Sequence, residues 1–243
     1  MQPRERTVAG ELLGAIRAID PSVGELRGAS RTDAGVHARG QLAVFAPRRE
    51  IPTRGWVLGL SAHLPPEIAV VGAARLPEAA ELRASIVRKR YRYLVLRHAL
   101  RDPFWEGRAW RVSHPLDIDR ARAEAEVLLG THDFEAFRSS NDERTHTVRT
   151  IEEISLAGLA GDARVLAIDV VGNAFLYNMV RIIVGSLVDV ARGRLPAGTF
   201  ARALRSLRRA DLGLTAPARG LYLEQIEHTL ELADAWPPRS VAS

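Results

Sequence analysis

A short polar loop between two apolar segments holds the residues of this chain that are best suited to chemistry. Residues 28–38 read GASRTDAGVHA, and glycines at both ends allow backbone angles closed to other residues. Such loops often display functional side chains. Arg31 and Asp33 lie two residues apart and share a face if the segment is extended. A carboxylate held in place can form and release a covalent adduct. The spacing alone favours a plainer interpretation, in which Asp33 caps a turn and Arg31 is a solvated charge.

The second informative segment is a long alternating stretch, residues 85–97. Tyr91, Tyr93 and Val95 fall on one face, and Arg88, Arg90 and Arg92 fall on the other. This pattern predicts a long strand with a basic face. Strand tyrosines often pack against a sheet, and that interpretation stays open for both of these.

Hydrophobic periodicity indicates the other elements that must position these residues. In the first half we expect helices at 7–19 and 56–63 and strands at 41–45 and 68–73. In the second half we expect helices at 118–129, 175–191 and 199–207 and strands at 148–155, 164–171 and 221–228. The strands alternate in polarity, which favours an α+β fold with an antiparallel sheet over a doubly wound parallel one. A break at Leu76-Pro77-Glu78 predicts two α+β halves, residues 1–80 and 81–243.

Composition excludes several classes of protein. The chain has 243 residues, of which 47% are hydrophobic and 26% charged, as expected for one or two globular domains. It has no cysteine, so disulfides, thiolate metal sites and a cysteine nucleophile are excluded. The seven histidines show no metal-ligand spacing, so we predict no metal site. No signal core or membrane span is expected.

The net charge of +5 comes almost wholly from arginine, because Lys89 is the one lysine among 34 basic residues. Arginine forks match phosphate oxygens and stack on bases, so this surface suits nucleic acid. A GC-rich genome would produce the same bias, and net charge alone does not separate the two explanations.

Five segments, in order, resemble the motifs of one enzyme family. The run ASRTDAGVHARGQ at 29–41 is similar to the catalytic segment GRTDAGVHA, with GQ shortly after, of the tRNA pseudouridine synthase A family. The others resemble its K/R-x-Y-x-Y strand, its DFxxFR segment, its FLxNMVRxIVG helix and its terminal GLYL strand; they lie at 89–93, 133–138, 175–185 and 220–223.

The resemblance implies an enzyme that detaches uracil from its ribose in tRNA and reattaches it through carbon, without a cofactor. Asp33 matches the family's nucleophile, and the resemblance leaves open whether it attacks C6 or C1′. Arg181 matches an arginine that pairs with this aspartate, and a nearby cation favours an ionised carboxylate. Without the resemblance, Arg181 is simply a polar residue on an amphipathic helix.

The resemblance also implies substrate-binding residues. Tyr91 matches a tyrosine that stacks on the target base and is proposed to assist proton removal from C5. Arg31 matches a residue that enters the space left by the flipped uridine, and Leu221 matches an apolar wall of the same pocket. Basic candidates for binding the tRNA backbone are Arg90, Arg144, Arg149, Arg205, Arg208 and Arg209, although solvated faces commonly carry such residues.

Family members usually form two ferredoxin-like halves that share one sheet with a basic cleft. They usually open with a strand and a YDGxxFxGWQ-like segment, whereas this chain begins at Met1-Gln2-Pro3, directly before the first helix. We therefore expect the first strand to be missing and the true start to lie upstream. Ser30 stands where the family usually has glycine.

The expected protein is a cytoplasmic homodimer that acts on uridines 38, 39 and 40 of the tRNA anticodon stem-loop. One alternative is an N-terminally truncated RNA-binding or tRNA-folding protein that has lost catalysis. Another is a related synthase that acts on a different RNA.

Overall fold

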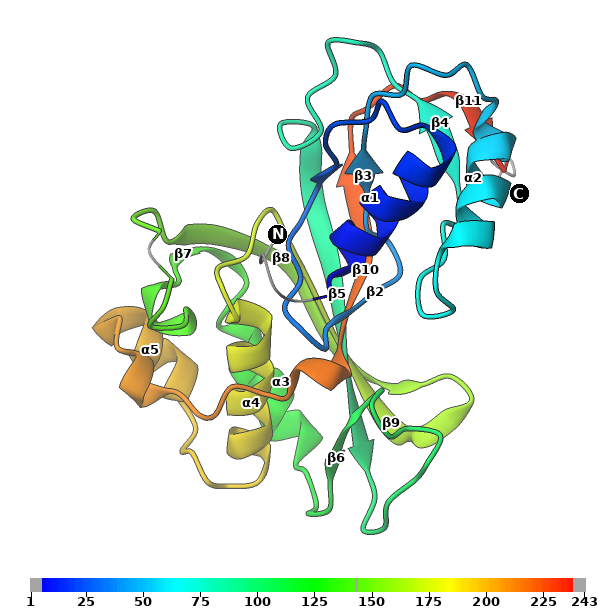
Figure 1. Ribbon diagram of the computed structural model, residues 1–243. Coiled ribbons are helices and arrows are strands. Elements are labelled where there is room, and N and C mark those ends of the chain that lie inside the picture. The colour runs from blue at the N-terminus through cyan, green and yellow to red at the C-terminus, as the bar shows by residue number, and fades with distance from the viewer. Residues whose placement is uncertain (1–5, 143, 238–243) are drawn as a thin grey trace, which may run out of the picture. The chain divides into compact units, whose positions relative to one another are not determined.

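The computed structural model describes residues 6–142 and 144–237, which form two compact units built from separated segments (Figure 1). The first unit comprises Met1–Arg31, Leu42–Ile86 and His228–Ser243, and the second comprises Thr32–Gln41 and Val87–Glu227. The loop that carries Asp33 therefore belongs to the second unit, although the chain around it belongs to the first. The predicted halves, 1–80 and 81–243, stay a prediction.

The first unit has two amphipathic helices and two small sheets. Its elements are α1 (Val8–Ile19), β1 (Arg27–Gly28), β3 (Ala43–Val44), α2 (Thr53–His63), β4 (Ala73–Arg75) and β11 (Ala233–Trp236). Helix α1 begins where Thr7 accepts a hydrogen bond from the Gly10 amide at 3.1 Å, as an N-cap threonine does. Ile16 and Trp56 belong to the buried cluster between α1 and α2. Strand β1 pairs with β3, and β4 pairs with β11, both antiparallel.

The second unit is a mixed sheet, mainly antiparallel, covered by helices. Its strands are β2 (His37–Ala38), β5 (Ile86–Arg97), β6 (Trp110–Val112), β7 (Gly130–Asp133), β8 (Val148–Leu159), β9 (Asp162–Gly172) and β10 (Leu221–His228). The sheet order is β2-β10-β5-β9-β8-β7, and β6 pairs with β5 outside this path. Strands β5, β9, β8 and β7 pair antiparallel, whereas β2 runs parallel to β10 and β6 runs parallel to β5. The predicted α+β class with a mainly antiparallel sheet is confirmed.

Helices α3 and α4 pack on each other, and α3 packs against β8 (Figure 1). The helices of the second unit are α3 (Ile118–Glu126), α4 (Met179–Ala191) and α5 (Thr199–Ser206), with short 3-10 turns at Glu135–Phe137, Arg209–Asp211 and Ala218–Gly220. Every residue of α4 except Arg181 is buried. Arg181 is thus the one partly exposed residue of an otherwise buried helix, and the packing of that helix fixes the position of its backbone.

Several predicted bounds are wrong for identifiable reasons. The strand predicted at 68–73 is irregular and its Val71 is exposed; strand β4 starts only at Ala73, where β11 supplies a partner. The strand predicted at 41–45 shortens to the two residues that pair with β1. The helix predicted at 118–129 ends at Glu126, and its expected terminal Gly130 begins β7 instead. The helix predicted at 175–191 starts at Met179, because Asn178 adopts a left-handed backbone.

Candidate active site

The loop that carries Asp33 turns tightly and then pairs with strand β10. The Val36 amide donates to the Asp33 carbonyl at 3.0 Å, and Gly35 occupies the third position of this turn with φ +80°. A type II turn requires such an angle, which glycine adopts without strain. Strand β2 follows at once, with His37 opposite Tyr222. The backbone thus closes the turn and leaves the Asp33 carboxylate available for other contacts.

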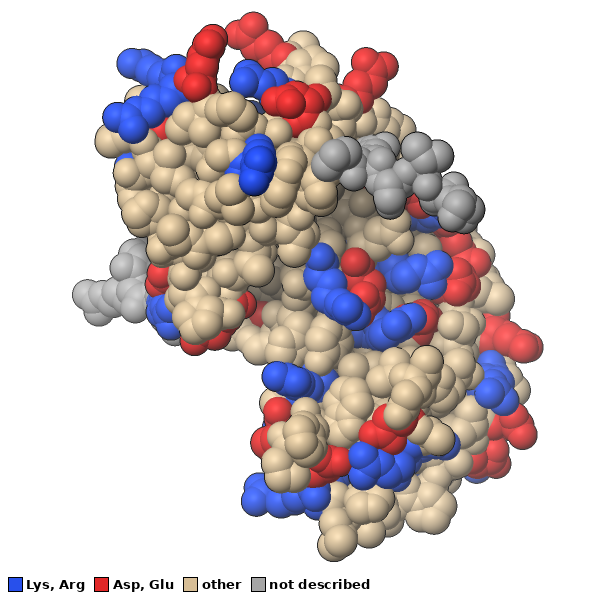
Figure 2. Space-filling model, turned by 90° about the vertical axis from the view of Figure 1, so that its right-hand side faces the viewer, with Lys and Arg blue, Asp and Glu red and all other residues tan. Residues whose placement is uncertain are grey.

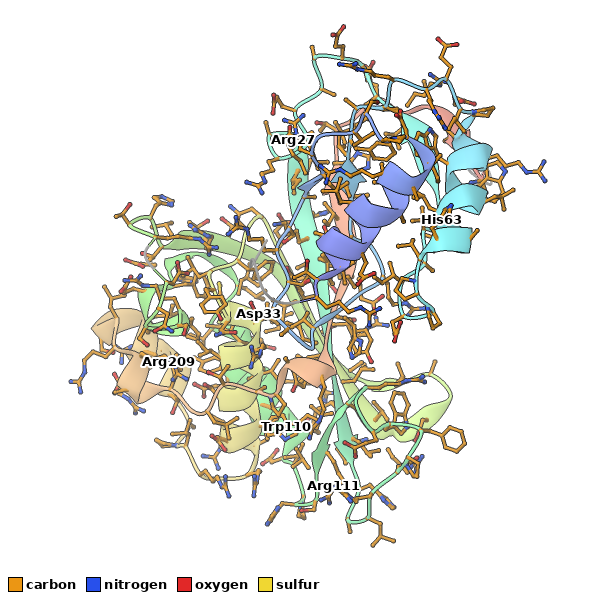
Figure 3. The ribbon with its side chains drawn as sticks, viewed as in Figure 1. Arg27, Asp33, His63, Trp110, Arg111 and Arg209 are labelled. Atoms are coloured by element: carbon orange, nitrogen blue, oxygen red, sulfur yellow. The ribbon has the colours of Figure 1, made fainter. Side chains whose placement is uncertain are left out.

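The Asp33 carboxylate pairs with Arg181. Arg181 Nη1 lies 3.2 Å from Asp33 Oδ2, and the two side chains keep 18% and 30% of their surface exposed. Figure 3 shows Asp33 beside the N-terminal end of α4, where Arg181 lies in the first turn. An arginine–carboxylate contact that is only partly exposed is less screened by solvent than a surface pair. The two residues that the sequence placed in one site are therefore in contact, although 148 positions separate them.

The guanidinium of Arg181 is also held by two other groups. Its Nε donates to the Ala216 carbonyl at 2.8 Å, and its Nη1 donates to Asn178 Oδ1 at 2.6 Å. The Ala216 amide in turn donates to the Arg181 carbonyl at 3.0 Å. A Cβ on Gly185 would lie 1.8 Å from the Leu214 carbonyl oxygen, so helix α4 packs directly against the segment that carries Ala216. This close approach fixes the segment that orients the arginine.

Tyr93 supports the same segment from strand β5. Its hydroxyl donates to the Pro217 carbonyl at 2.7 Å, and its ring is fully buried. Burial raises the pKa of Tyr93 well above its ordinary value, so the phenol keeps the proton that it donates. Gly220 packs against this ring so closely that a Cβ would lie 2.5 Å from a ring carbon. Tyr93 therefore packs inside the protein, in agreement with the interpretation that strand tyrosines pack against a sheet. It also holds the segment that contacts Arg181.

Replacing Tyr93 with Phe should destabilise the fold by about 1–2 kcal/mol, because a partly buried carbonyl loses its shortest hydrogen bond. Urea denaturation of the purified protein measures this change. Tyr222→Phe is the matched control, since Tyr222 donates to the Arg108 carbonyl at 2.7 Å in an exposed setting. We expect the control to lose about 0.5 kcal/mol or less. Equal losses of unfolding free energy in the two variants would contradict the role of the Tyr93 hydroxyl in holding this segment.

Tyr91 lies two residues before Tyr93 on the same face of β5. It is 8% exposed and meets Phe175 edge-to-face, with ring centroids 5.1 Å apart. Phe175 belongs to the segment that leads into α4. Tyr91 therefore lies against the segment that leads from Phe175 to Asn178, directly before the helix that carries Arg181.

Leu221 is buried at the start of β10, directly after Gly220. This position places it next to the segment that Tyr93 supports. Arg31 is exposed, two residues before Asp33 in the chain.

The strand predicted to have a basic face has a row of ion pairs instead. Arg90 makes two bonds to the Glu153 carboxylate, at 2.9 and 3.2 Å, and Arg92 makes two bonds to Asp169, both at 2.8 Å. Arg88 pairs with Glu227 and Glu152. In the face shown in Figure 2, acidic and basic side chains are likewise interspersed. These arginines are neutralised by neighbours, and Arg90 would have to exchange Glu153 for a phosphate in order to bind RNA.

Arg144 contacts the segment that precedes α4, and Arg149 lies in strand β8. Arg144 Nη1 donates to the Phe175 carbonyl at 3.2 Å, and half of the Arg144 side chain is exposed. Arg149 Nη1 lies 3.1 Å from His146 Nδ1, and burial lowers the pKa of Arg149. Arg144 therefore belongs to the surroundings of Phe175, whereas Arg149 contacts His146 and the Val148 carbonyl.

Asp142 is a buried carboxylate that sequence reasoning missed. It accepts hydrogen bonds from the amides of Tyr177 at 2.8 Å and Arg144 at 3.2 Å. Burial alone would raise the pKa of Asp142, but these two amides and the charges of Arg144 and Arg138 lower it. Asp142 thus fixes the backbone immediately before Asn178. Its position after Arg138, in an irregular polar stretch, gave no periodic signal.

Because the folded pKa of Asp142 is lowered, its ionised form stabilises the fold above about pH 4. This stabilisation is lost as the pH falls through the lowered pKa. Asp142→Asn should therefore cost about 1–3 kcal/mol at pH 7, and the gap from the wild type should narrow at pH 3. Urea denaturation at both pH values measures the gap. Asp119→Asn is the control, because the Asp119 side chain is almost fully exposed and its ion pair with Arg122 should contribute about 0.5 kcal/mol or less at either pH. A gap that stays constant would contradict the role of ionised Asp142.

Residues 6–142 and 144–237 contain no group of three or more His, Asp or Glu side chains that could hold a metal ion. No helix within the same ranges is both long and apolar enough to cross a membrane.

Comparison with known proteins shows the family. The sequence model described as tRNA pseudouridine synthase matches residues 125–228. The tRNA pseudouridine synthase A of Myxococcus xanthus is 40% identical over 226 residues, which cover 93% of this chain and 84% of that protein. The chain belongs to the tRNA pseudouridine synthase A family. The enzymes of the same name from Halalkalibacterium halodurans and Geobacter sp. strain M21 are also 40% identical; the matches cover 91% and 93% of this chain and 83% and 91% of theirs.

Membership of the tRNA pseudouridine synthase A family explains why these residues come together. The sequence identified Asp33, Arg181, Tyr91 and Leu221 through motifs, but it did not identify the groups that hold them. Asn178 stood inside a recognised motif without a role, and Ala216, Pro217 and Asp142 act through backbone groups or in irregular segments. Such residues leave no signal in the side-chain pattern.

Proposed function

We propose that this protein is an isomerase that converts uridine to pseudouridine in the anticodon stem-loop of tRNA, at positions 38, 39 and 40. The observation that carries the proposal is the contact of Asp33 with Arg181, made by two segments that both match family motifs. The relatives' name supports tRNA as the substrate. The family's architecture of two ferredoxin-like halves is part of this proposal, and the mainly antiparallel sheet is the observation that agrees with it.

The isomerisation needs no external reactant. The bond between C1′ and N1 breaks and a bond between C1′ and C5 forms, while C5 loses its hydrogen and N1 gains one. Asp33 acts as the nucleophile that forms a covalent adduct with the uridine and is later released. Arg181 pairs with the carboxylate and aims it, because Arg181 is itself fixed by Ala216 and Asn178. No cofactor takes part.

The other predicted residues bind the substrate. The ring of Tyr91 stacks on the flipped base, which would contribute about 1–3 kcal/mol, and its hydroxyl assists proton removal from C5. Leu221 forms an apolar wall, where low polarity strengthens the contact of Asp33 with Arg181. Arg31 enters the space that the uridine leaves. Arg144, Arg149 and Arg90 contact the tRNA backbone. The protein works in the cytoplasm as a homodimer.

Release of tritium from tRNA labelled at uridine C5 tests this function directly, because only C5 loses its hydrogen. We expect release from transcripts with uridine at 38, 39 or 40 and none when all three are cytidine. Release that ignores these positions would favour a related synthase with another target. Binding of tRNA without any release would favour the RNA-binding alternative.

A further inference from the structure

The residue directly before α4 is an asparagine whose side chain does not cap the helix. Asn178 stands at the N-cap position with φ 62° and ψ 5°, and its side chain accepts no bond from the helix backbone. An N-cap asparagine usually has extended backbone and accepts from an amide of the first turn, a contact worth about 1 kcal/mol. A left-handed backbone also carries a cost for any residue except glycine, although asparagine tolerates it better than most. The chain gives up this stabilisation at a point next to the active site.

The side chain of Asn178 contacts the catalytic arginine instead. Its Oδ1 accepts from Arg181 Nη1 at 2.6 Å, and the same nitrogen lies 3.2 Å from Asp33 Oδ2. At the other end of the guanidinium, Nε donates to Ala216. Because a guanidinium is planar, two bonds at different nitrogens fix the orientation of the whole group. Asn178 therefore determines where Nη1 points.

The backbone on the N-terminal side of Asn178 is itself fixed. The Tyr177 amide donates to Asp142, and the Tyr177 carbonyl accepts from the Ser139 amide at 3.1 Å. On the other side, the Met179 amide donates to the Leu176 carbonyl at 3.1 Å. An unfavourable backbone angle held by so many contacts is typical of functional sites.

We propose that Asn178 is a positioning residue that aims Arg181 at the Asp33 carboxylate, and that its left-handed backbone exists to deliver this contact. The inference rests on the proposed function, since it assigns Asn178 a part in that reaction. Asn178 acts through Arg181 and not through contact with the tRNA.

Asn178→Gly tests the side chain without disturbing the backbone. Glycine relieves the left-handed backbone, which offsets part of the lost bond to Arg181, and no helix cap is lost, so the melting temperature should stay within about 4 °C of the wild type. The single-turnover rate of tritium release should fall about 10- to 100-fold, while the Kd for tRNA changes less than about twofold. Leu207→Gly is the matched control, because Leu207 is also left-handed, with φ 57°, and exposed at the end of α5. We expect the control to keep the wild-type rate.

A double-mutant cycle with Arg181→Lys shows whether Asn178 acts through Arg181. In the Arg181→Lys background, followed with excess enzyme over hours, adding Asn178→Gly should change the rate less than about twofold. An undiminished effect there, an unchanged rate in the single variant, or a rate loss matched by a melting temperature more than about 5 °C lower would each overturn the inference. Tritium release by the wild type distinguishes a failure of this inference from a failure of the proposed function. If the wild type releases none, the function fails; if it is active and Asn178→Gly is equally active, the inference alone fails.

Discussion

Asp33→Asn is expected to lower the single-turnover rate of tritium release by about four orders of magnitude or more. An amide is a far weaker nucleophile than a carboxylate, and loss of a nucleophile has effects of this size in other enzymes with covalent intermediates. The fold should persist, because the turn at Asp33 is closed by its backbone carbonyl and Asn can still accept from Arg181. The measurement uses excess enzyme over labelled tRNA, with tRNA binding followed in parallel.

Asp133→Asn is a control for general effects of removing a carboxylate. Asp133 accepts from the Thr147 hydroxyl at 2.6 Å and has no contact with Arg181 among the described bonds. It should keep most of the activity that Asp33→Asn loses. A rate for Asp33→Asn within about tenfold of the wild type would remove Asp33 from the nucleophile's role.

Arg181→Lys is expected to lower the same rate by about 100-fold, comparable to the loss of one fixed donor at a reacting centre. Lysine keeps the positive charge, but its single ammonium cannot reproduce the planar fork that contacts Ala216, Asn178 and Asp33 together. We expect the effect in the rate and not in the Kd for tRNA, because the arginine faces the carboxylate.

Arg164→Lys is the matched control for an arginine in an ion-pair cluster. Arg164 bridges Asp102 and Asp162, at 2.9 and 2.7 Å, in a part of the second unit to which no role in the reaction is assigned. Its rate should match the wild type. If Arg181→Lys kept full activity, charge alone would suffice and the geometry around the guanidinium would have no catalytic part.

Strongly periodic elements could be predicted from the sequence. The bounds of α1, β5 and β10 agree with expectation to within a residue, because each shows several apolar positions at one period. The short strands β7 and β11 escaped prediction, since four residues show too little alternation and each strand depends on its pairing, with β8 and with β4. The start of α4 failed for a different reason. The apolar run from Phe175 continues the helical period, but hydrogen bonds of Asp142 and Ser139 to Tyr177 hold the chain outside the helix until Met179.

In the candidate site, too, one part could be predicted from the sequence and another part could not. Motifs identified the contact of Asp33 with Arg181, because both side chains take part directly. They could not show that Arg90 pairs with Glu153, since that contact depends on register: both residues lie opposite Val171, on the two sides of β9. The alternating arginines of β5 therefore indicated a basic face, but carboxylates on the neighbouring strands neutralise these arginines.

The membership of residues 32–41 in the second unit has a consequence for how the enzyme is made. During synthesis, the loop that carries Asp33 leaves the ribosome nearly two hundred residues before strand β10, which pairs with strand β2 at the end of that loop. Contacts this distant in sequence form late and slow the folding of a domain. A nascent chain can thus expose Asp33 to the cell long before Arg181 and β10 have been synthesised. The contact of Asp33 with Arg181 and the pairing of β2 with β10 form only when synthesis of the sheet is almost complete.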